Sequence, residues 1–220
     1  DDLDTCENPY RQLIVWDPDA EEILGGYRYM LCNEASRDAN GHLILATSHL
    51  FHFSERFCKE YIPYTLELGR SFVQPDYQSS KAGAKALFAL DNLWDGLGAL
   101  TVDHPEIKYF FGKVTMYTHF HTEARNLIQY FFFKYFRDKE NLVYPKKPVD
   151  FRIDMDKMAE IFVGSDYKED YKILTQSVRQ YGENIPPLFN AYMNLSPSMK
   201  TFGTVINDTF GDVLETGIIL

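Results

Sequence analysis

A strand that ends at a proline is encoded by Glu67-Leu68-Gly69-Arg70-Ser71-Phe72-Val73-Gln74-Pro75-Asp76-Tyr77. We predict a strand over residues 64–74, which Pro75 ends because proline offers no N–H to a ladder. Side chains alternate along a strand, so Glu67 and Arg70 face opposite sides unless an extra residue intervenes. A bulge near Gly69 is expected, since glycine tolerates the backbone angles involved. Carboxylates and guanidinium groups are rarely buried unless they form ion pairs or take part in binding or catalysis. Glu67 and Arg70 therefore predict a functional site at this strand end.

The remaining elements follow from hydrophobic spacing and turn residues. Residues 33–49 are predicted to be a loop with a turn at Asn40-Gly41. The order of elements predicts an α+β fold in one domain over residues 1–220, with residues 151–200 as a helical insertion before the closing strands. Other strands are predicted at 11–16, 23–31, 108–116, 201–206 and 213–220, and helices at 81–100, 122–137 and 154–182, the last broken at Gly164-Ser165.

Composition and charge limit the class of function. The formal net charge of −10 argues against nucleic acid as a partner, because phosphate binding needs clustered cations. The apolar runs fall short of a membrane span, and no charged-then-apolar leader opens the sequence. The three cysteines have no close pair, which favours reduced thiols. We therefore expect a cytoplasmic protein.

One stretch of the sequence is locally basic. Between residues 134 and 147, five basic residues stand against two acidic ones, a local charge of +3. The stretch is either a solvated face or a docking patch for an acidic carrier protein or lipid head groups. The residues concerned are Lys134, Arg137, Lys139, Lys146 and Lys147, against Asp138 and Glu140, with Lys81 and Lys85 as a second basic spot.

Several blocks, in order, resemble one protein family. The pattern Glu-x-Gly-Arg-x-x-Val-x-Pro-x-Tyr at 67–77 is followed by Leu-Trp-Asp-Gly-Leu at 93–97 and Tyr-Phe-Phe-Gly at 109–112. Further blocks stand at 4–17, 185–192 and 208–210. The series resembles the ornithine-lipid and glycine-lipid N-acyltransferases, bacterial GNAT proteins often labelled hemolysins. The Glu-x-x-Arg pattern is also similar to that of acyl-homoserine-lactone synthases.

The resemblance implies a fold and a reaction. The fold is a GNAT-like mixed, twisted sheet flanked by helices, here expected to lack the first strand and helices. The reaction is transfer of a fatty acyl group, 3-hydroxy acyl groups included, from acyl carrier protein to the α-amine of glycine or ornithine in aminolipid synthesis. The alternatives are a coenzyme A-dependent acetyltransferase and a catalytically degenerate acyl-binding module.

The acceptor amine must lose a proton before it can attack a thioester. Glu67 is the candidate general base, with a salt bridge to Arg70 as the structural alternative. Arg70 either holds the carboxylate of the amino-acid acceptor or orders Glu67. Backbone N–H groups at Phe72 and Val73 are expected to stabilise the oxyanion.

The donor is expected at the start of the helix after the central strand, where backbone N–H groups can bind phosphate. Gln78 and Gly83 match the phosphate-binding loop of the resembled family, whereas Lys81 replaces its first glycine. This favours acyl carrier protein over coenzyme A, and Lys85 adds a basic group nearby. No cofactor is expected to be resident, the thioester being a substrate.

A fatty acyl chain needs an apolar tunnel. Phe110, Phe111 and Phe132 are the candidate lining residues, with ordinary core packing as the alternative. No metal is expected, because the spaced pairs His49/His52 and His119/His121 lack completing ligands. Beyond the carrier protein and the amino acid, expected contacts are a peripheral one with the inner membrane and self-association through an exposed sheet edge at residues 11–32.

Overall fold

The structure is a computed structural model that describes residues 9–77 and 84–220, with the side chains of residues 84–91 left out. The chain divides into two compact units. Unit 1 comprises Asp1–His49 and Glu55–Gly112, and unit 2 comprises Leu50–Ser54 and Lys113–Leu220.

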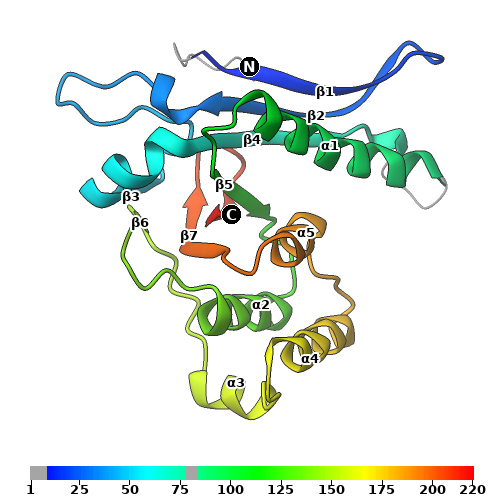
Figure 1. Cartoon of the computed structure of the whole chain (residues 1–220). Coiled ribbons are helices and arrows are strands. Elements are labelled where there is room, and N and C mark those ends of the chain that lie inside the picture. Colours follow the sequence, from blue (N-terminus) through cyan, green and yellow to red (C-terminus); the bar gives the residue numbers. More distant parts are fainter. Residues whose placement is uncertain (1–8, 78–83) are drawn as a thin grey trace. The chain divides into compact units, whose positions relative to one another are not determined.

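Unit 1 contains a hairpin, a central strand and one long helix (Figure 1). Strands β1 (Arg11–Asp17) and β2 (Glu22–Leu31) pair antiparallel, and β2 pairs antiparallel with β4 (Thr65–Val73). Helix α1 (Ala84–Asp103) runs alongside these strands. The strands predicted at 11–16, 23–31 and 64–74 are therefore confirmed within about two residues, the usual uncertainty of element ends.

Strand β4 carries the predicted bulge. Gly69 pairs with Arg28 and Phe72 pairs with Gly26, so Arg70 and Ser71 together oppose a single residue of β2. Arg70 takes a φ of 49°, in the left-handed region that non-glycine residues rarely adopt. The neighbouring pairing holds this strained conformation in place. The bulge is confirmed, but the positive φ falls on Arg70.

The parallel pairing between β4 and β5 (Tyr109–Met116) covers only the first part of β4. It joins Thr65–Leu68 to Tyr109–Gly112, and β4 then continues to Val73 beside β2. The backbones approach closely at the last pair, because a Cβ on Gly112 would lie 2.6 Å from the carbonyl oxygen of Leu68. A glycine is therefore required where this ladder ends.

Replacing Gly112 with alanine is expected to destabilise unit 1 by about 1–3 kcal/mol, the cost of overpacking against a backbone that cannot move aside. Gly98→Ala is the matched control, because a Cβ at this helical position meets nothing within 4 Å. The control should be neutral or slightly stabilising. Urea unfolding of both variants measures the difference, and equal midpoints would contradict the close approach.

The core of unit 1 lies between its strands and α1. The partly buried side chains of Leu13, Val15 and Trp94 pack against this core. Burying an aliphatic or aromatic side chain contributes roughly 1.5–3 kcal/mol, so this cluster fixes which face of the strands α1 covers. Its buried members are Tyr27, Leu31, Leu66, Leu68, Leu93, Leu97, Leu100 and Ile107.

Unit 2 combines helices with short strand pairs. Strands β3 (Phe51–Phe53) and β6 (Val143–Pro145) pair antiparallel, as do β7 (Lys200–Asn207) and β8 (Val213–Ile219). The helices are α2 (Thr122–Tyr135), α3 (Met155–Ile161), α4 (Tyr167–Gln180) and α5 (Pro187–Leu195).

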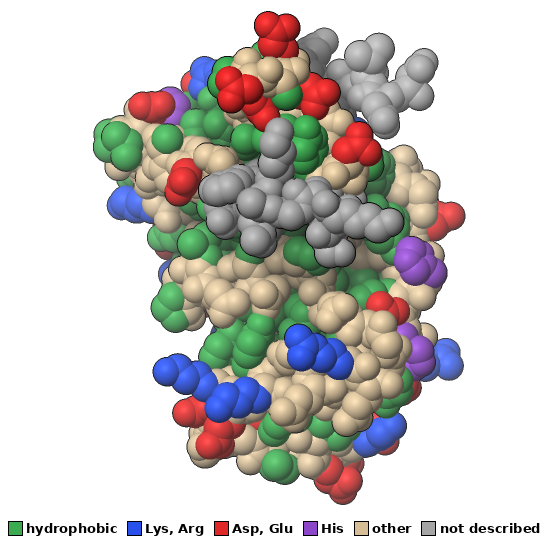
Figure 2. All heavy atoms as spheres, turned by 90° about the vertical axis from the view of Figure 1, so that its right-hand side faces the viewer, with side chains coloured by type: hydrophobic (Ala, Val, Ile, Leu, Met, Phe, Trp, Pro, Cys, Tyr) green, Lys and Arg blue, Asp and Glu red, His purple; other side chains and the backbone are tan. Residues whose placement is uncertain are grey.

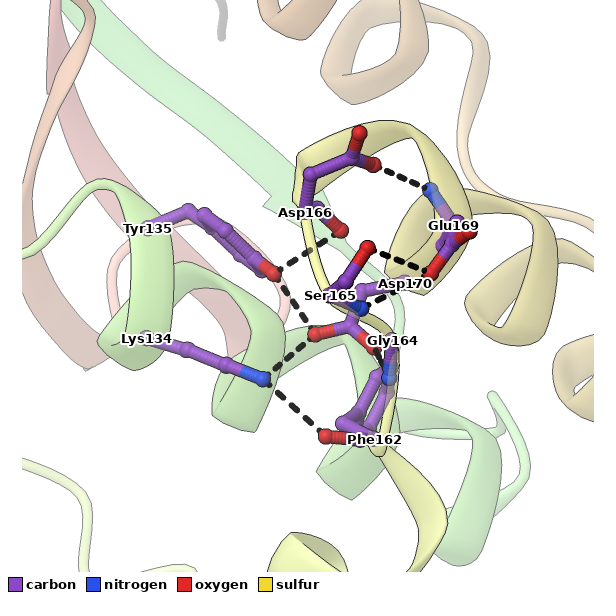
Figure 3. A network of polar contacts seen from close by, with 8 residues as sticks. All are labelled: Lys134, Tyr135, Phe162, Gly164, Ser165, Asp166, Glu169 and Asp170. Atoms are coloured by element: carbon purple, nitrogen blue, oxygen red, sulfur yellow. Dashed lines mark hydrogen bonds and ion pairs between the residues drawn. The ribbon is translucent and has the colours of Figure 1, made fainter.

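A buried ion pair joins α2 to α4 in unit 2 (Figure 3). The carboxylate of Asp170 has no exposed surface and accepts hydrogen bonds from Lys134 Nζ at 2.5 Å, Tyr135 Oη at 2.6 Å and the Gly164 N–H at 2.8 Å. Lys134 also donates to the carbonyl of Phe162 at 3.0 Å. The break predicted at Gly164-Ser165 is thus the turn whose backbone is fixed by Asp170.

In unit 1 the strand order is β1-β2-β4-β5, with antiparallel pairing up to β4, parallel pairing between β4 and β5, and α1 beside the strands, and in unit 2 the antiparallel pair β7-β8 accompanies four helices. This confirms the predicted α+β, GNAT-like fold. The sequence did not predict β3 and β6, which are too short to show a periodic pattern. It also did not predict α5, whose first helical residue is a proline, nor the π- and 3-10 turns at 57–64.

Candidate functional site

The carboxylate of Glu67 lies at the centre of the candidate site, in unit 1. Its side chain is 1% exposed, on the inner part of β4 between β2 and β5. It accepts hydrogen bonds from Tyr10 Oη at 2.5 Å, the Ala46 N–H at 3.2 Å, the Thr47 N–H at 3.1 Å and Thr47 Oγ1 at 2.8 Å. A buried carboxylate needs such donors, because each unsatisfied charge costs several kcal/mol.

Tyr10 links Glu67 to the segment at residues 33–49, which contains Ala46. Its hydroxyl donates to Glu67 and accepts from the N–H of Ala46 at 2.8 Å. The Arg28 guanidinium lies over the Tyr10 ring, 4.3 Å from its centroid. A phenol, a carboxylate and a guanidinium thus meet at one point, which is the kind of cluster that can move a proton and bind an anion.

Two arginines, Arg28 and Arg70, contribute to the electrostatics of this cluster. Burial lowers the pKa of Arg28, Glu67 opposes this shift, and Arg70 adds to it. Arg70 itself is exposed, and the hydrogen bonds recorded for Glu67 in the described part of the chain come from Tyr10, Ala46 and Thr47. The predicted alternative, a salt bridge between Glu67 and Arg70, is therefore not the contact that holds Glu67.

Burial raises the pKa of the nearby Cys32 thiol well above its ordinary value, and the charge of Glu67 raises it further. Cys32 therefore stays a protonated thiol and behaves as a buried apolar side chain. Cys58 is also a free thiol. The reduced state that the sequence predicts is the state of both cysteines here, and Cys6 lies outside the described residues.

Phe72 and Val73, the predicted oxyanion residues, follow the bulge and pair with Gly26 and Gly25. The backbone approach is close, since a Cβ on Gly25 would lie 2.6 Å from the Phe72 carbonyl oxygen. The Phe72 side chain is exposed beside Gly26. Their oxyanion role stays a prediction.

Most of the residues predicted to bind the acyl donor lie outside the residues that the structure describes. Gln78, Lys81 and Gly83 lie in the segment that the structure does not describe, and Lys85 lies in α1 with its side chain left out. The predicted phosphate-binding loop therefore stays a prediction.

The three candidate tunnel residues are packed side chains. Phe111 is 1% exposed and lies edge-on to Phe57, at 5.5 Å between ring centroids, whereas Phe110 packs against the core of unit 1. Phe132 belongs to unit 2, where it packs edge-on to Phe189 at 5.0 Å. Within the described residues these contacts match the core-packing alternative, and the tunnel stays a prediction.

Two of the five basic residues at 134–147 have contacts of their own. Lys134 is paired with Asp170, and the Arg137 guanidinium lies over the ring of Phe133 at 4.6 Å. Figure 2 draws one face of the molecule without labelling single residues, and on that face Lys and Arg side chains lie singly or in small groups. Docking of an acidic partner would fall to Lys139, Lys146 and Lys147, which are exposed.

Three of the four histidines in the spaced pairs contact tyrosine rings. His52 contacts Tyr144, His119 stacks on Tyr117, and His121 stacks on Tyr181. Among the residues that the structure describes, no three metal-ligating side chains cluster. Within the same residues, no helix has the length and apolarity to cross a bilayer.

Sequence reasoning missed Tyr10, Arg28 and Thr47. Arg28 left a signal, since it is a charged residue inside the otherwise apolar strand predicted at 23–31. Alternation places Arg28 and Met30 on one face, and Met30 pairs with Glu67. Tyr10 and Thr47 left none, because neither lies in a periodic segment.

Comparison with known proteins identifies relatives over the whole chain. The family described as "Acetyltransferase (GNAT) domain" matches residues 1–87. A protein of Phocaeicola vulgatus named glycine N(alpha)-acyltransferase is 59% identical over 220 residues, all of this chain and 68% of the relative. A Bacteroides thetaiotaomicron protein of the same name is also 59% identical over 220 residues, which cover 65% of its length. The chain thus spans about two thirds of each relative. No solved structure matches.

Proposed function

The chain belongs to the family of GNAT N-acyltransferases, and from this membership we propose that it transfers a fatty acyl group to the α-amine of glycine. The observation that carries the proposal is 59% identity over all 220 residues to relatives named glycine N(alpha)-acyltransferase. Their name favours glycine over ornithine as the acceptor. The acyl group is a long-chain one, 3-hydroxy acyl groups included, and the product is an aminolipid precursor.

The Glu67 cluster supplies the proton transfer in this proposal. The amine nitrogen attacks the thioester carbon, the new C–N bond forms, and the C–S bond breaks with release of a thiolate. Glu67 is buried, so Tyr10 connects it to the amine: Tyr10 Oη takes the amine proton as its own proton passes to Glu67. The thiolate takes a proton from solvent, and Glu67 gives its proton back to solvent through Tyr10, which restores the carboxylate for the next turnover.

Arg70 is proposed to hold the carboxylate of glycine. Its exposed guanidinium can bind a carboxylate through two parallel hydrogen bonds. The bulge holds its backbone at a φ of 49°. The backbone at Phe72 and Val73 is proposed to stabilise the oxyanion, and Gln78, Lys81, Gly83 and Lys85 to bind the phosphopantetheine arm.

Acyl carrier protein is proposed as the donor, with acyl-coenzyme A as the alternative. We expect purified protein to form N-acylglycine faster from acyl carrier protein than from acyl-coenzyme A. Added salt should raise KM for the carrier only, because exposed charges are screened beyond about 8–10 Å at physiological salt. Mass spectrometry of the product, with glycine and ornithine supplied together, measures both donor and acceptor choice.

Lys146→Glu/Lys147→Glu is the variant that tests the carrier contact, because both side chains are exposed. It should raise KM for the carrier and leave KM for acyl-coenzyme A unchanged. Arg56→Glu is the control, an exposed cation of unit 1 that pairs with Glu60. Equal, salt-independent rates with both donors would support the acyl-coenzyme A alternative. Cytoplasmic location, peripheral membrane contact and self-association through residues 11–32 stay predictions.

A further inference from the structure

A polar cavity of about 200 Å³ lies within unit 2, between α4 and α5. Sites for drug-sized ligands usually span about 300–1,000 Å³, so this cavity fits a molecule the size of a short amino-acid derivative. Its lining residues are Tyr171, Thr175, Arg179, Asn184, Ile185 and Asn190.

Arg179 gives the cavity its charge. It is exposed, and none of the six lining residues is acidic, although the chain as a whole carries a net charge of −10. Within the described residues no ion pair involves Arg179, in contrast to Lys134 on α2, which is paired with Asp170. A guanidinium with an open approach binds carboxylates through two parallel hydrogen bonds.

The side-chain amides of Asn184 and Asn190 also line the cavity and favour a ligand that can form hydrogen bonds with them. Asn190 Oδ1 accepts a hydrogen bond from Tyr171 Oη, which turns the amide so that its Nδ2 hydrogens remain as donors. Asn184 brings another carboxamide, which can both donate and accept. Thr175 Oγ1 donates to the Tyr171 carbonyl at 2.9 Å, so its lone pairs stay available as acceptors. Ile185 supplies the apolar contact.

We propose that this cavity binds the head group of an N-acyl amino acid, with the carboxylate on Arg179 and the adjacent amide bond on Asn184 and Asn190. Such a head group carries one carboxylate next to one amide, which matches one guanidinium beside two carboxamides. The inference rests on the proposed function, whose product has this head group. Unit 2 then holds a product site, and the reaction should be inhibited by its product.

The test uses N-acetylglycine as a soluble probe and nuclear magnetic resonance of the side-chain amides of the intact chain. Saturable shifts are expected at Asn184 and Asn190. Acetate, which lacks the amide, and glycine, whose ammonium faces Arg179, should each bind about tenfold or more weakly, the scale of one charge-assisted contact. Tighter binding of inorganic phosphate than of N-acetylglycine would overturn the proposal in favour of a phosphate site.

Arg179→Gln should weaken N-acetylglycine binding about tenfold or more. Arg179→Lys keeps the positive charge but loses the two parallel N–H donors of the guanidinium, so its affinity for N-acetylglycine should lie between those of the wild type and Arg179→Gln. Lys172→Gln is the matched control, because it removes the same charge from the same helix without lining the cavity. If Arg179→Gln and Lys172→Gln weaken N-acetylglycine binding equally, the probe is attracted only by the general positive charge of the helix, and the proposed site is overturned. Unchanged circular dichroism establishes that the variants are folded.

The outcome separates this site from the proposed function. If the chain makes N-acylglycine but does not bind N-acetylglycine in the cavity, the product site is wrong and the proposed function stands. If N-acetylglycine binds through Arg179 and the chain acylates no glycine, the head-group site stands and the proposed function is wrong.

Discussion

Glu67→Gln is expected to lower turnover by about 10²–10⁴-fold, the usual effect of losing a positioned acid–base group. Glutamine keeps the shape of glutamate but cannot take a proton from Tyr10. Turnover near the wild-type value at pH 7 would remove Glu67 from the mechanism.

The same substitution is also expected to affect folding. The buried carboxylate accepts four hydrogen bonds. An NH₂ group in place of one oxygen would face a donor, which costs about 1–3 kcal/mol. A second variant is therefore needed to separate folding from chemistry.

Tyr10→Phe keeps the carboxylate of Glu67 and removes only the hydroxyl that donates to it. If Tyr10 passes the proton, the variant should lose turnover while its KM for glycine changes little. Thr47→Val is the control, because it removes one donor to Glu67 from the other side of the carboxylate. Equal loss of turnover in the two variants, in proportion to lost stability, would mean that the cluster is structural.

Asp170→Asn is expected to destabilise unit 2 by about 3 kcal/mol, the lower end of the range for breaking a buried ion pair. The lower end applies because the Lys134 side chain is 32% exposed and can regain water. The amide would also direct a donor at the N–H of Gly164 or at Lys134. Urea unfolding and hydrogen exchange of the α2 and α4 amides measure the loss.

Two variants test the ion pair itself. Asp166→Asn makes the same change at the N-cap of α4, where asparagine caps about as well as aspartate, and should cost a few tenths of a kcal/mol. Asp170→Asn/Lys134→Met should recover part of the loss, because it removes the uncompensated charge. Equal destabilisation by Asp166→Asn and Asp170→Asn would contradict the network.

The pH dependence has a defined sign. Burial alone would raise the pKa of Asp170, but hydrogen bonds from Lys134, Tyr135 and Gly164 outweigh it and hold the pKa below its ordinary value. A lowered pKa stabilises the fold above the unfolded pKa of about 3.9 and ceases to do so as the pH falls through the folded pKa. The stability difference between wild type and Asp170→Asn should therefore shrink below about pH 4.

Local pattern was enough to predict the strand at 64–74, its bulge, the hairpin before it and the break at Gly164-Ser165. Each of these depends on residues next to one another, such as glycine at a bulge or proline after a strand. The ordered blocks likewise pointed to the acyltransferase family. Element ends and segments of three residues were not predictable, since they hold too few residues for a period to show.

The partners of the charged side chains were decided by tertiary structure. Tyr10 lies 57 residues from Glu67, and Lys134 lies 36 residues from Asp170. From the sequence, a salt bridge to Arg70 was only the alternative for Glu67, and Lys134 belonged to a stretch that was either a solvated face or a docking patch. Neither distant partner was predicted, because a sequence presents only near neighbours. Which donor meets a buried carboxylate depends on strand register and on the path of the connecting loops. A buried carboxylate is stable only where those paths bring its hydrogen-bond donors within about 3 Å.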